Sequence, residues 1–236
     1  MVNYEESIKK PFTEIGKLIL GIILSIVPIV NWIAQGFILE CSGVGKNKPS
    51  KKMPEWKDLG DYFVKGFLSY VIMFIYAIPA ILVFLVAAGF AAASMIGAFS
   101  GMVPQEMMSS MMAGQANKAE MAQFFSQNWM LTLPSLIAIA PLLIIGLILL
   151  LGAVYFSPIA VLNYIKNKKF GKAFDFNFIF KKSFTANYFI VWIIVGVIGI
   201  VLKTVLAFIP WIGSAIAFFI AGVISFSLFG EIFREK

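Results

Sequence analysis

The sequence contains no histidine, a single cysteine and few charged residues. Without histidine, the chain lacks the side chain that most often transfers protons or binds transition metals near neutral pH. The single cysteine, Cys41, excludes an intramolecular disulfide and any cysteine-rich metal site. Charged residues make up 13% of the chain, whereas about 25% is usual for a soluble domain. These shortages argue against a soluble, metal-dependent or disulfide-stabilised protein.

Catalytic sequence motifs are also missing from the chain. The sequence has no Walker loop, no Gly-x-Ser-x-Gly and no His-Glu-x-x-His pattern. An intramembrane protease would need a serine–histidine pair or paired aspartates, and no apolar segment carries an aspartate in its interior. We therefore predict that the protein is not an enzyme, and we assign no catalytic, cofactor-binding or metal-binding residue.

Long apolar runs dominate what remains. Hydrophobic residues make up 60% of the chain, and the mean hydropathy is +0.90. Residues 67–99 carry no charge, and neither do residues 128–165. A helix that crosses a bilayer needs about 20 apolar residues. The sequence therefore predicts an all-α fold, a polytopic transmembrane helical bundle in the cell membrane.

Six apolar segments form one predicted integral membrane domain, residues 1–236. The segments cover residues 15–27, 29–44, 64–99, 129–164, 187–208 and 211–233, and an outer loop covers residues 100–128. Several segments contain proline, which membrane helices tolerate because neighbouring groups satisfy the freed carbonyls.

The distribution of lysine predicts the orientation of these segments. The loop after the second segment carries Lys46, Lys48, Lys51, Lys52, Lys57 and Lys65, and the loop after the fourth carries Lys166, Lys168, Lys169, Lys172, Lys181 and Lys182. The outer loop carries only Lys118. The positive-inside rule then places both lysine-rich loops in the cytoplasm, together with a C-terminus that contains Arg234 and Lys236.

Two proline-containing stretches are predicted to be hairpin turns. Pro28 and Asn31 separate the first two segments, and Pro210 and Gly213 separate the last two in a similar local sequence. The first pair of segments has alternative interpretations. It is a hairpin with a cytoplasmic N-terminus, either spanning or re-entrant, or it is one helix bent at Pro28 with the N-terminus outside.

Both lysine-rich loops contain amphipathic stretches. Residues 54–63 place Trp56, Leu59 and Phe63 at helical spacing, and residues 170–184 place phenylalanines between lysines. Both are predicted to be helices in the headgroup layer of the cytoplasmic leaflet, with aromatic side chains towards the lipid. The predicted membrane-interface residues are Trp56, Phe63, Phe170 and Phe174.

Three short motifs resemble a known family. They are the Pro-x-x-Asn turn at Pro28, the run Pro54-Glu55-Trp56-Lys57-Asp58, and Phe170-x-x-Ala173-Phe174. Together they are similar to the DUF 4013 family of multi-pass membrane proteins, found largely in archaea. The resemblance implies a multi-pass helical fold in an archaeal or bacterial cell membrane, and it implies no activity.

Methionines are concentrated in the outer loop. Their positions are Met102, Met107, Met108, Met111, Met112 and Met121. Thioethers bind Cu(I), but flexible methionines more commonly pack an amphipathic helix against a bilayer or a partner. We expect packing here, because the loop contains no cysteine or histidine.

Polar and small residues near the membrane suggest further contacts. Glu40, at the end of the second segment, either takes part in a transport pathway or simply reaches the headgroup zone beside Lys46. Small residues from Ala87 to Ala98, with Gly196 and Gly199, suit close helix packing within the chain, in a homo-oligomer or with a membrane-protein partner.

The net charge of +7 lies mainly in loops beside apolar segments. This arrangement indicates attraction to anionic lipid headgroups of the bilayer rather than to nucleic acid. The leading prediction is a non-enzymatic membrane-organising, accessory or scaffold protein. The alternative is a small transporter or channel-like carrier, which the proline-broken segments favour.

Overall fold

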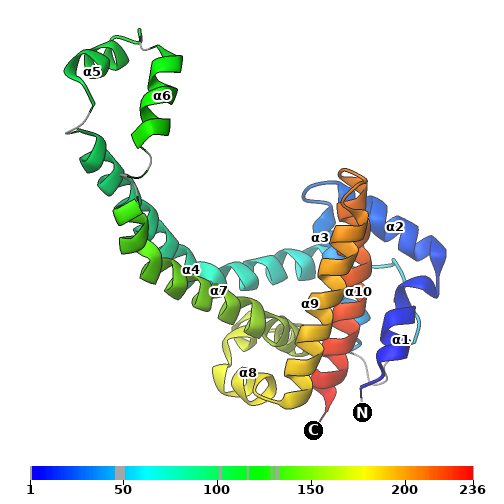
Figure 1. The fold of residues 1–236 in the computed structure, drawn as a ribbon. Helices are drawn as coiled ribbons and strands as arrows, with labels where there is room; N and C mark the ends of the chain where they lie inside the picture. The colour runs from blue at the N-terminus through cyan, green and yellow to red at the C-terminus, as the bar shows by residue number, and fades with distance from the viewer. Residues whose placement is uncertain are drawn as a thin grey trace. The chain divides into compact units, whose positions relative to one another are not determined.

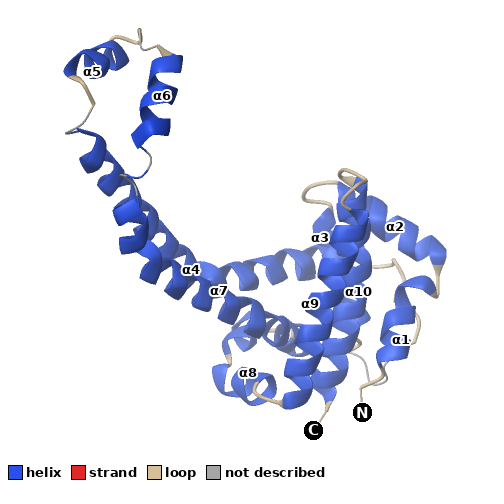
Figure 2. Cartoon of the chain, in the orientation of Figure 1, coloured by secondary structure: helices blue, strands red, loops and turns tan. Residues whose placement is uncertain are grey.

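The computed structural model describes residues 2–45, 51–100, 103–115, 117–128, 130 and 133–235. Throughout this part of the chain the structure is helical and contains no strand (Figures 1 and 2). Lys46, Lys48, Met102 and Lys236 lie outside the described residues, as do parts of the outer loop and of the start of the fourth segment.

The helices follow one another along the chain with short connections. They are α1 (Tyr4–Lys9), η1 (Lys10–Phe12), α2 (Ile15–Ile26), α3 (Asn31–Cys41), α4 (Leu59–Ser100), α5 (Gln105–Met112), α6 (Lys118–Asn128), α7 (Leu133–Asn167), η3 (Phe170–Phe174), α8 (Phe176–Ser183), α9 (Ala186–Leu206) and α10 (Ile212–Arg234).

Four of the described helices are long and apolar enough to cross a membrane. They lie at Leu59–Ser94, Ile137–Asn167, Ala186–Leu206 and Ile212–Arg234. The predicted count of six segments is not confirmed, because α2 has 12 residues and α3 has 11. At 1.5 Å per residue a 12-residue helix is about 18 Å long, shorter than the hydrocarbon core.

The chain divides into two compact units. Unit 1 contains residues 1–76 and 153–236, and unit 2 contains residues 77–152. Both boundaries fall inside continuous helices, α4 and α7. Hydropathy carries no signal for such a division, because the helices remain apolar on both sides of it.

The helix α10 forms the centre of unit 1. It packs against α9, α2, α3 and α1, and Figure 1 shows α9 and α10 lying side by side. The short helix α3 is the most enclosed partner, with Phe37, Ile38 and Leu39 fully buried. The core of unit 1 therefore joins segments from the two ends of the sequence.

Glycines allow close helix contacts in unit 1. A Cβ atom on Gly36 of α3 would lie 1.9 Å from the carbonyl oxygen of Tyr62 in α4. On the opposite side of the same contact, a Cβ on Gly66 would lie 1.8 Å from the carbonyl oxygen of Trp32. The two main chains approach this closely only because both positions lack a side chain.

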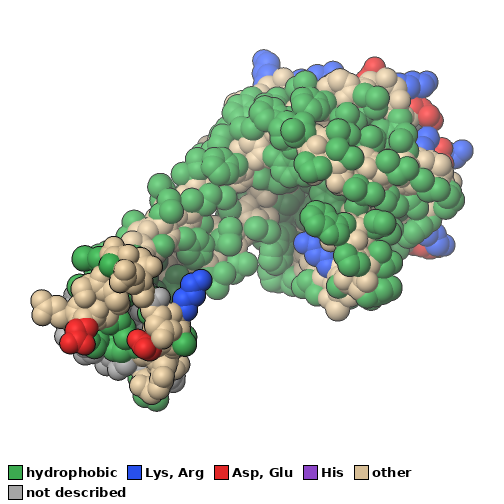
Figure 3. All heavy atoms as spheres, turned by 90° about the horizontal axis from the view of Figure 1, so that it is seen from above, with side chains coloured by type: hydrophobic (Ala, Val, Ile, Leu, Met, Phe, Trp, Pro, Cys, Tyr) green, Lys and Arg blue, Asp and Glu red, His purple; other side chains and the backbone are tan. Residues whose placement is uncertain are grey.

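Unit 2 pairs the second part of α4 with the first part of α7. Gly146 of α7 accommodates the ring of Phe84, since a Cβ there would lie 2.6 Å from that ring. Many other apolar side chains are exposed, including Leu85 at 63% and Ile137 at 72%. Figure 3 shows hydrophobic side chains over most of the surface in view, as expected for helices that face lipid.

The outer loop contains two short helices of unit 2, α5 and α6. Met107 and Met111 are four residues apart on α5, so they share one face of that helix. Met112 is 84% exposed. Copper binding and packing against a partner both stay predictions for this loop.

Candidate membrane interface

The helix α8 lies beyond the end of α7 and leads into α9 within unit 1. Asp175 caps its N-terminus, where the carboxylate accepts a hydrogen bond from the Phe178 amide at 3.4 Å. Lys181 and Lys182 occupy the last turn, where positive charge interacts favourably with the helix dipole. This local sequence therefore specifies a short helix with a defined beginning and a basic end.

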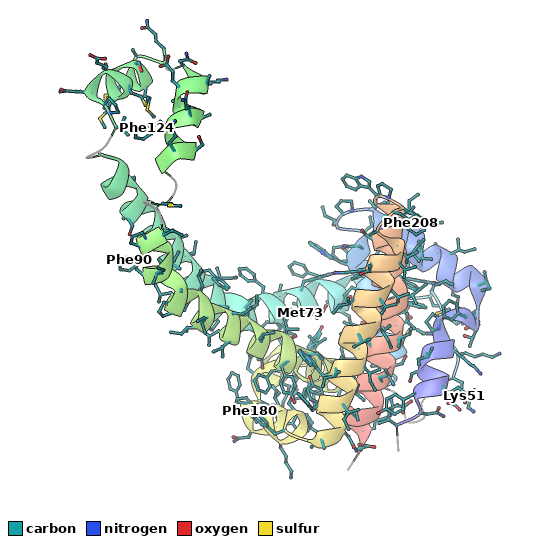
Figure 4. The ribbon with its side chains drawn as sticks, viewed as in Figure 1. Lys51, Met73, Phe90, Phe124, Phe180 and Phe208 are labelled. Carbon is teal, nitrogen blue, oxygen red and sulfur yellow. The ribbon has the colours of Figure 1, made fainter. Side chains whose placement is uncertain are left out.

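The two faces of α8 differ in burial. Ile179 and Ser183 are fully buried against unit 1. Phe176, Phe180 and Phe184 point outwards and are 50%, 42% and 73% exposed. Figure 4 shows Phe180 on the outer side of the helix.

The exposed rings form a continuous stripe. The ring centroids of Phe176 and Phe180 are 6.0 Å apart, and those of Phe180 and Phe184 are 5.9 Å apart. Phe156 of α7 joins them, 5.0 Å from Phe180. We call Phe156, Phe176, Phe180 and Phe184 the aromatic stripe. Spacings of 4.5–7 Å are those of attractive aromatic pairs.

The predicted interface residues Phe170 and Phe174 precede this helix. Phe170 is 37% exposed and packs against Phe174 at 5.4 Å. Phe174 stacks on Tyr76 of α4, 5.8 Å between centroids, and the Tyr76 hydroxyl donates to the carbonyl of Ala173 at 2.7 Å. Phe174 therefore helps to attach the loop to unit 1.

Sequence reasoning missed Phe176 and Phe184 as exposed aromatic residues. The usable signal was the spacing of four residues from Phe176 to Phe180 to Phe184, directly after a capping aspartate. The predicted residues Phe170 and Phe174 lie in the separate short helix η3, because Asp175 starts a new helix.

The first lysine-rich loop differs from its prediction. A helix over residues 54–63 is wrong in its first half, since residues 53–55 have no regular structure and α4 begins at Leu59. Trp56 is half-buried and its indole stacks on Phe37 of α3, with centroids 3.7 Å apart and planes at 9°. Its ring nitrogen is buried and makes no hydrogen bond within the described residues. Phe63 lies on α4 and packs against Trp32 at 5.4 Å.

Ionic contacts explain why the loop turns inwards at Trp56. Lys17 of α2 contacts Glu55 at 2.7 Å and Glu14 at 2.8 Å, and it donates to the carbonyl of Met53 at 3.4 Å. The hydrogen bond from the Lys17 ammonium to the Glu55 carboxylate lowers the pKa of Glu55. The Tyr62 hydroxyl donates to the carbonyl of Glu55 at 2.7 Å. These bonds hold residues 53–55 against unit 1.

Glu40 lies in an ion cluster with α4. Its carboxylate is 2.9 Å from the Lys65 ammonium, and Lys65 also contacts Asp61 at 2.5 Å. The side chains of Lys65 and Glu40 are only 13% and 16% exposed. The cluster joins α3 to α4, and a transport role for Glu40 stays a prediction.

The two proline turns share one backbone arrangement. At the first, the Val30 amide donates to the carbonyl of Pro28 at 2.8 Å, and the Asn31 amide donates to the carbonyl of Val27 at 2.9 Å. At the second, Ile212 donates to Pro210 at 2.7 Å and Gly213 to Ile209 at 2.9 Å. The residue after each proline, Ile29 or Trp211, has positive φ, 70° or 63°.

These turns separate helices within unit 1. The structure has two helices, α2 and α3, where the alternative interpretation expected one helix bent at Pro28. Gly213 permits the second turn to close, because a Cβ there would lie 2.0 Å from the carbonyl oxygen of Leu206. Whether the α2–α3 pair crosses a membrane stays a prediction.

The comparisons with known proteins identify a family and no close relative. No curated protein and no solved structure matches the chain. The family described as "Protein of unknown function (DUF4013)" matches residues 19–211, which include the last part of α2, the first proline turn and α3 to α9. Since the match covers most of the sequence, the chain belongs to the DUF4013 family of proteins of unknown function.

Proposed function

We propose that this protein is a non-enzymatic membrane-organising or accessory protein of the cell membrane. In this proposal α8 rests on the cytoplasmic leaflet, with the aromatic stripe in the headgroup layer and the neighbouring lysines against anionic lipid. The observation that carries the proposal is the exposure of Phe176 and Phe180 of α8, and of Phe184 directly after it, while Ile179 and Ser183 of the same helix are buried. An aromatic face bordered by lysine is typical of helices that lie in the membrane interface.

Contacts at one end of α10 support the proposed orientation. Arg234 donates a hydrogen bond to the carbonyl of Ser42, where the first lysine-rich loop begins. Lys182, in the second lysine-rich loop, donates to the carbonyl of Glu235. Both loops therefore meet the same end of α10, as the positive-inside rule requires of two cytoplasmic loops. Lys203 lies towards the other end of α9, beside the second proline turn.

The expected membrane affinity of α8 comes from two sources. Full burial of one phenylalanine side chain contributes roughly 1.5–3 kcal/mol, and the three outward rings of α8 are about half exposed. Each lysine close to an anionic surface adds about 1 kcal/mol at low salt. Lys166, Lys168, Lys169, Lys172 and Lys181 are exposed around this helix. Together these groups attract anionic lipid while leaving individual lipids free to exchange.

Lipid sorting by the full chain tests the proposal. Reconstituted protein carrying a fluorescent donor at Asn177 of α8 is mixed with acceptor-labelled anionic lipid in a phosphatidylcholine bilayer. We expect energy transfer above the random value for the wild type. Combined replacement of Phe176, Phe180 and Phe184 by alanine should lower it towards random.

The matched control replaces three other exposed phenylalanines by alanine, namely Phe74, Phe90 and Phe208. Figure 4 shows Phe208 and Phe180 near opposite ends of α9. The control variant should sort lipids like the wild type. Random energy transfer in the wild type itself would remove the basis of the proposal.

A small carrier is the second candidate function, favoured by a cavity beside the proline turns. This cavity has a volume of about 510 Å³ and is lined in part by Ser25, Asn31 and Ser214. Fully buried aromatic rings, Phe37 and Phe219, fill the core between α3 and α10. Solute-driven swelling of reconstituted vesicles tests this candidate, and a flux lost in Asn31→Leu would favour the carrier over the organising protein.

A further inference from the structure

A polar cavity lies at the lysine-rich end of unit 1, between α1, η1 and the C-terminal ends of α3 and α10. Its volume is about 450 Å³. Four polar side chains in its wall are more than nine-tenths buried: Ser7 at 2% exposed, Lys10 at 7%, Ser42 at 2% and Ser227 at 4%. Each of the four hydrogen-bonds within the protein, so the wall is polar and held in place by its own contacts.

The cavity contains the single arginine of a chain whose other 18 basic residues are all lysine. The guanidinium of Arg234 donates to the carbonyl of Ser42 at 2.6 Å. Among the described residues no carboxylate lies within ion-pair distance of it. Arginine differs from lysine in presenting a planar fork of donors, which binds an oxyanion through two parallel hydrogen bonds.

A second cation, Lys10, lines the same cavity as Arg234. The ammonium of Lys10 donates to the carbonyl of Cys41 at 2.6 Å, one residue before the carbonyl that Arg234 contacts. Two successive carbonyls at the end of α3 thus each accept a hydrogen bond from a cation that lines the cavity. Such a pair is more than a helix end needs, since a helix terminus carries only about half an elementary charge.

The carboxylates around the cavity have partners of their own. Glu231 accepts hydrogen bonds from the Asn3 amide at 2.5 Å and from the Ser7 hydroxyl at 3.3 Å. Glu6 pairs with Lys51 at 2.6 Å. Glu235 accepts from the side-chain amide of Asn187 at 3.1 Å. Each of these carboxylates therefore has a hydrogen-bond or ion-pair partner of its own, and Glu231 also interacts electrostatically with Arg234.

We propose that this cavity binds a phosphate group, held by the fork of Arg234 with Lys10 as the second cation. Phosphate matches both the two-donor geometry of arginine and the net positive charge of the pair. The group reaches the cavity either on a phospholipid of the adjacent leaflet or as soluble phosphate. The site does not involve the aromatic stripe, so it stands independently of the proposed function.

Thermal unfolding of the full chain in a neutral detergent tests the soluble source. Inorganic phosphate is compared with chloride at equal ionic strength, and we expect phosphate to raise the Tm of the wild type. Arg234→Lys keeps the charge but removes the fork, so it should lose most of that rise. The control Lys57→Gln changes an exposed lysine outside the cavity and should respond like the wild type.

Lipid retention tests the other source. Purified protein is exchanged into micelles that contain phosphatidic acid or phosphatidylcholine, and bound lipid is counted by native mass spectrometry. Phosphatidic acid retained by the wild type and lost in Arg234→Lys, without a rise in Tm from free phosphate, supports the site and assigns it to lipid.

Two results overturn the proposal. One is that neither phosphate nor phosphatidic acid affects the wild type, and the other is that Arg234→Lys responds as strongly as the wild type. Should Arg234→Lys fail to fold, Lys51→Gln at the exposed rim of the cavity replaces it. Lys51→Gln should bind inorganic phosphate or phosphatidic acid several-fold more weakly than Lys57→Gln does. Equal binding by the two variants would overturn the proposal.

Discussion

Replacing Trp56 by alanine tests whether the first lysine-rich loop is held by protein packing or by lipid. The indole stacks on Phe37 at 3.7 Å and meets Tyr62 edge-on at 6.1 Å. Truncating a buried aromatic residue to alanine costs about 3–5 kcal/mol, and Trp56 is half-buried. We therefore expect Trp56→Ala to lower the free energy of unfolding by about 2–3 kcal/mol.

Two further variants separate the parts of this loss. Trp56→Phe keeps a ring on Phe37 and removes an indole N–H that is buried without a partner in the described structure. Leaving such a group unsatisfied costs about 1–3 kcal/mol, so the loss for this variant should stay below about 1 kcal/mol. Lys57→Ala removes an exposed side chain and should change the stability by less than about 0.5 kcal/mol.

The assay is unfolding of the full chain by denaturant, measured in both detergent micelles and lipid bicelles. Packing against Phe37 predicts the same order of variants in both environments. A loss for Trp56→Ala that appears only in bicelles would show that lipid holds the indole. Equal effects of Trp56→Ala and Lys57→Ala would show that the segment is a solvated linker, and the packing argument would be refuted.

Three other predictions follow from the packing, the caps and the charge pattern. Gly36→Ala should destabilise unit 1 by about 1–3 kcal/mol, because its Cβ would meet a main-chain carbonyl, whereas Gly196→Ala has open space and should be neutral or stabilising in the same assay. A hydrogen bond from Lys172 lowers the pKa of Asp175 in the folded state. The stability that the ionised Asp175 carboxylate gives to α8 should therefore be complete above about pH 4 and lost as the pH falls through the lower folded pKa. Protection of the α8 amides from hydrogen exchange measures this loss. Cysteine at Ser110 should react with an impermeant reagent from outside and cysteine at Asn167 only from inside, and the reverse pattern would contradict the orientation. Protection of the α8 amides that does not fall at low pH would contradict the prediction for Asp175. Equal losses of stability for Gly36→Ala and Gly196→Ala would contradict the prediction for the glycines.

Periodicity and composition predicted much of the fold and little of the site. The four long apolar helices and the separation of α9 from α10 at Pro210 are local properties of the sequence, so hydropathy and turn residues suffice. The direction of Trp56 is not local. It depends on Lys17 and Phe37, which belong to other helices and reach the loop only after unit 1 has packed. The amphipathic spacing of the sequence alone predicted that the Trp56 indole faces lipid.

Glycine positions show the same limit of sequence reasoning. Gly196 and Gly199 were predicted to pack within the chain or against a second copy or partner, and a Cβ at either would meet nothing within 4 Å in the described structure, so only packing against another molecule stays a prediction. The contacts use Gly36, Gly66 and Gly146 instead. Every helix in an apolar sequence offers small residues, and only the arrangement of neighbours decides which of them are needed.

The central place of α10 has a consequence for the biogenesis of this protein. A ribosome completes α10 after the other described helices, yet α1, α2 and α3 pack on it. The N-terminal helices must therefore wait in the bilayer or its interface, without their final neighbour, while about 170 residues are synthesised between Cys41 and Ile212. During that interval Gln35 and Lys10, both buried in the finished protein, have no core to enter. Insertion factors that shield polar groups within nascent membrane segments are the helpers that such a chain would need.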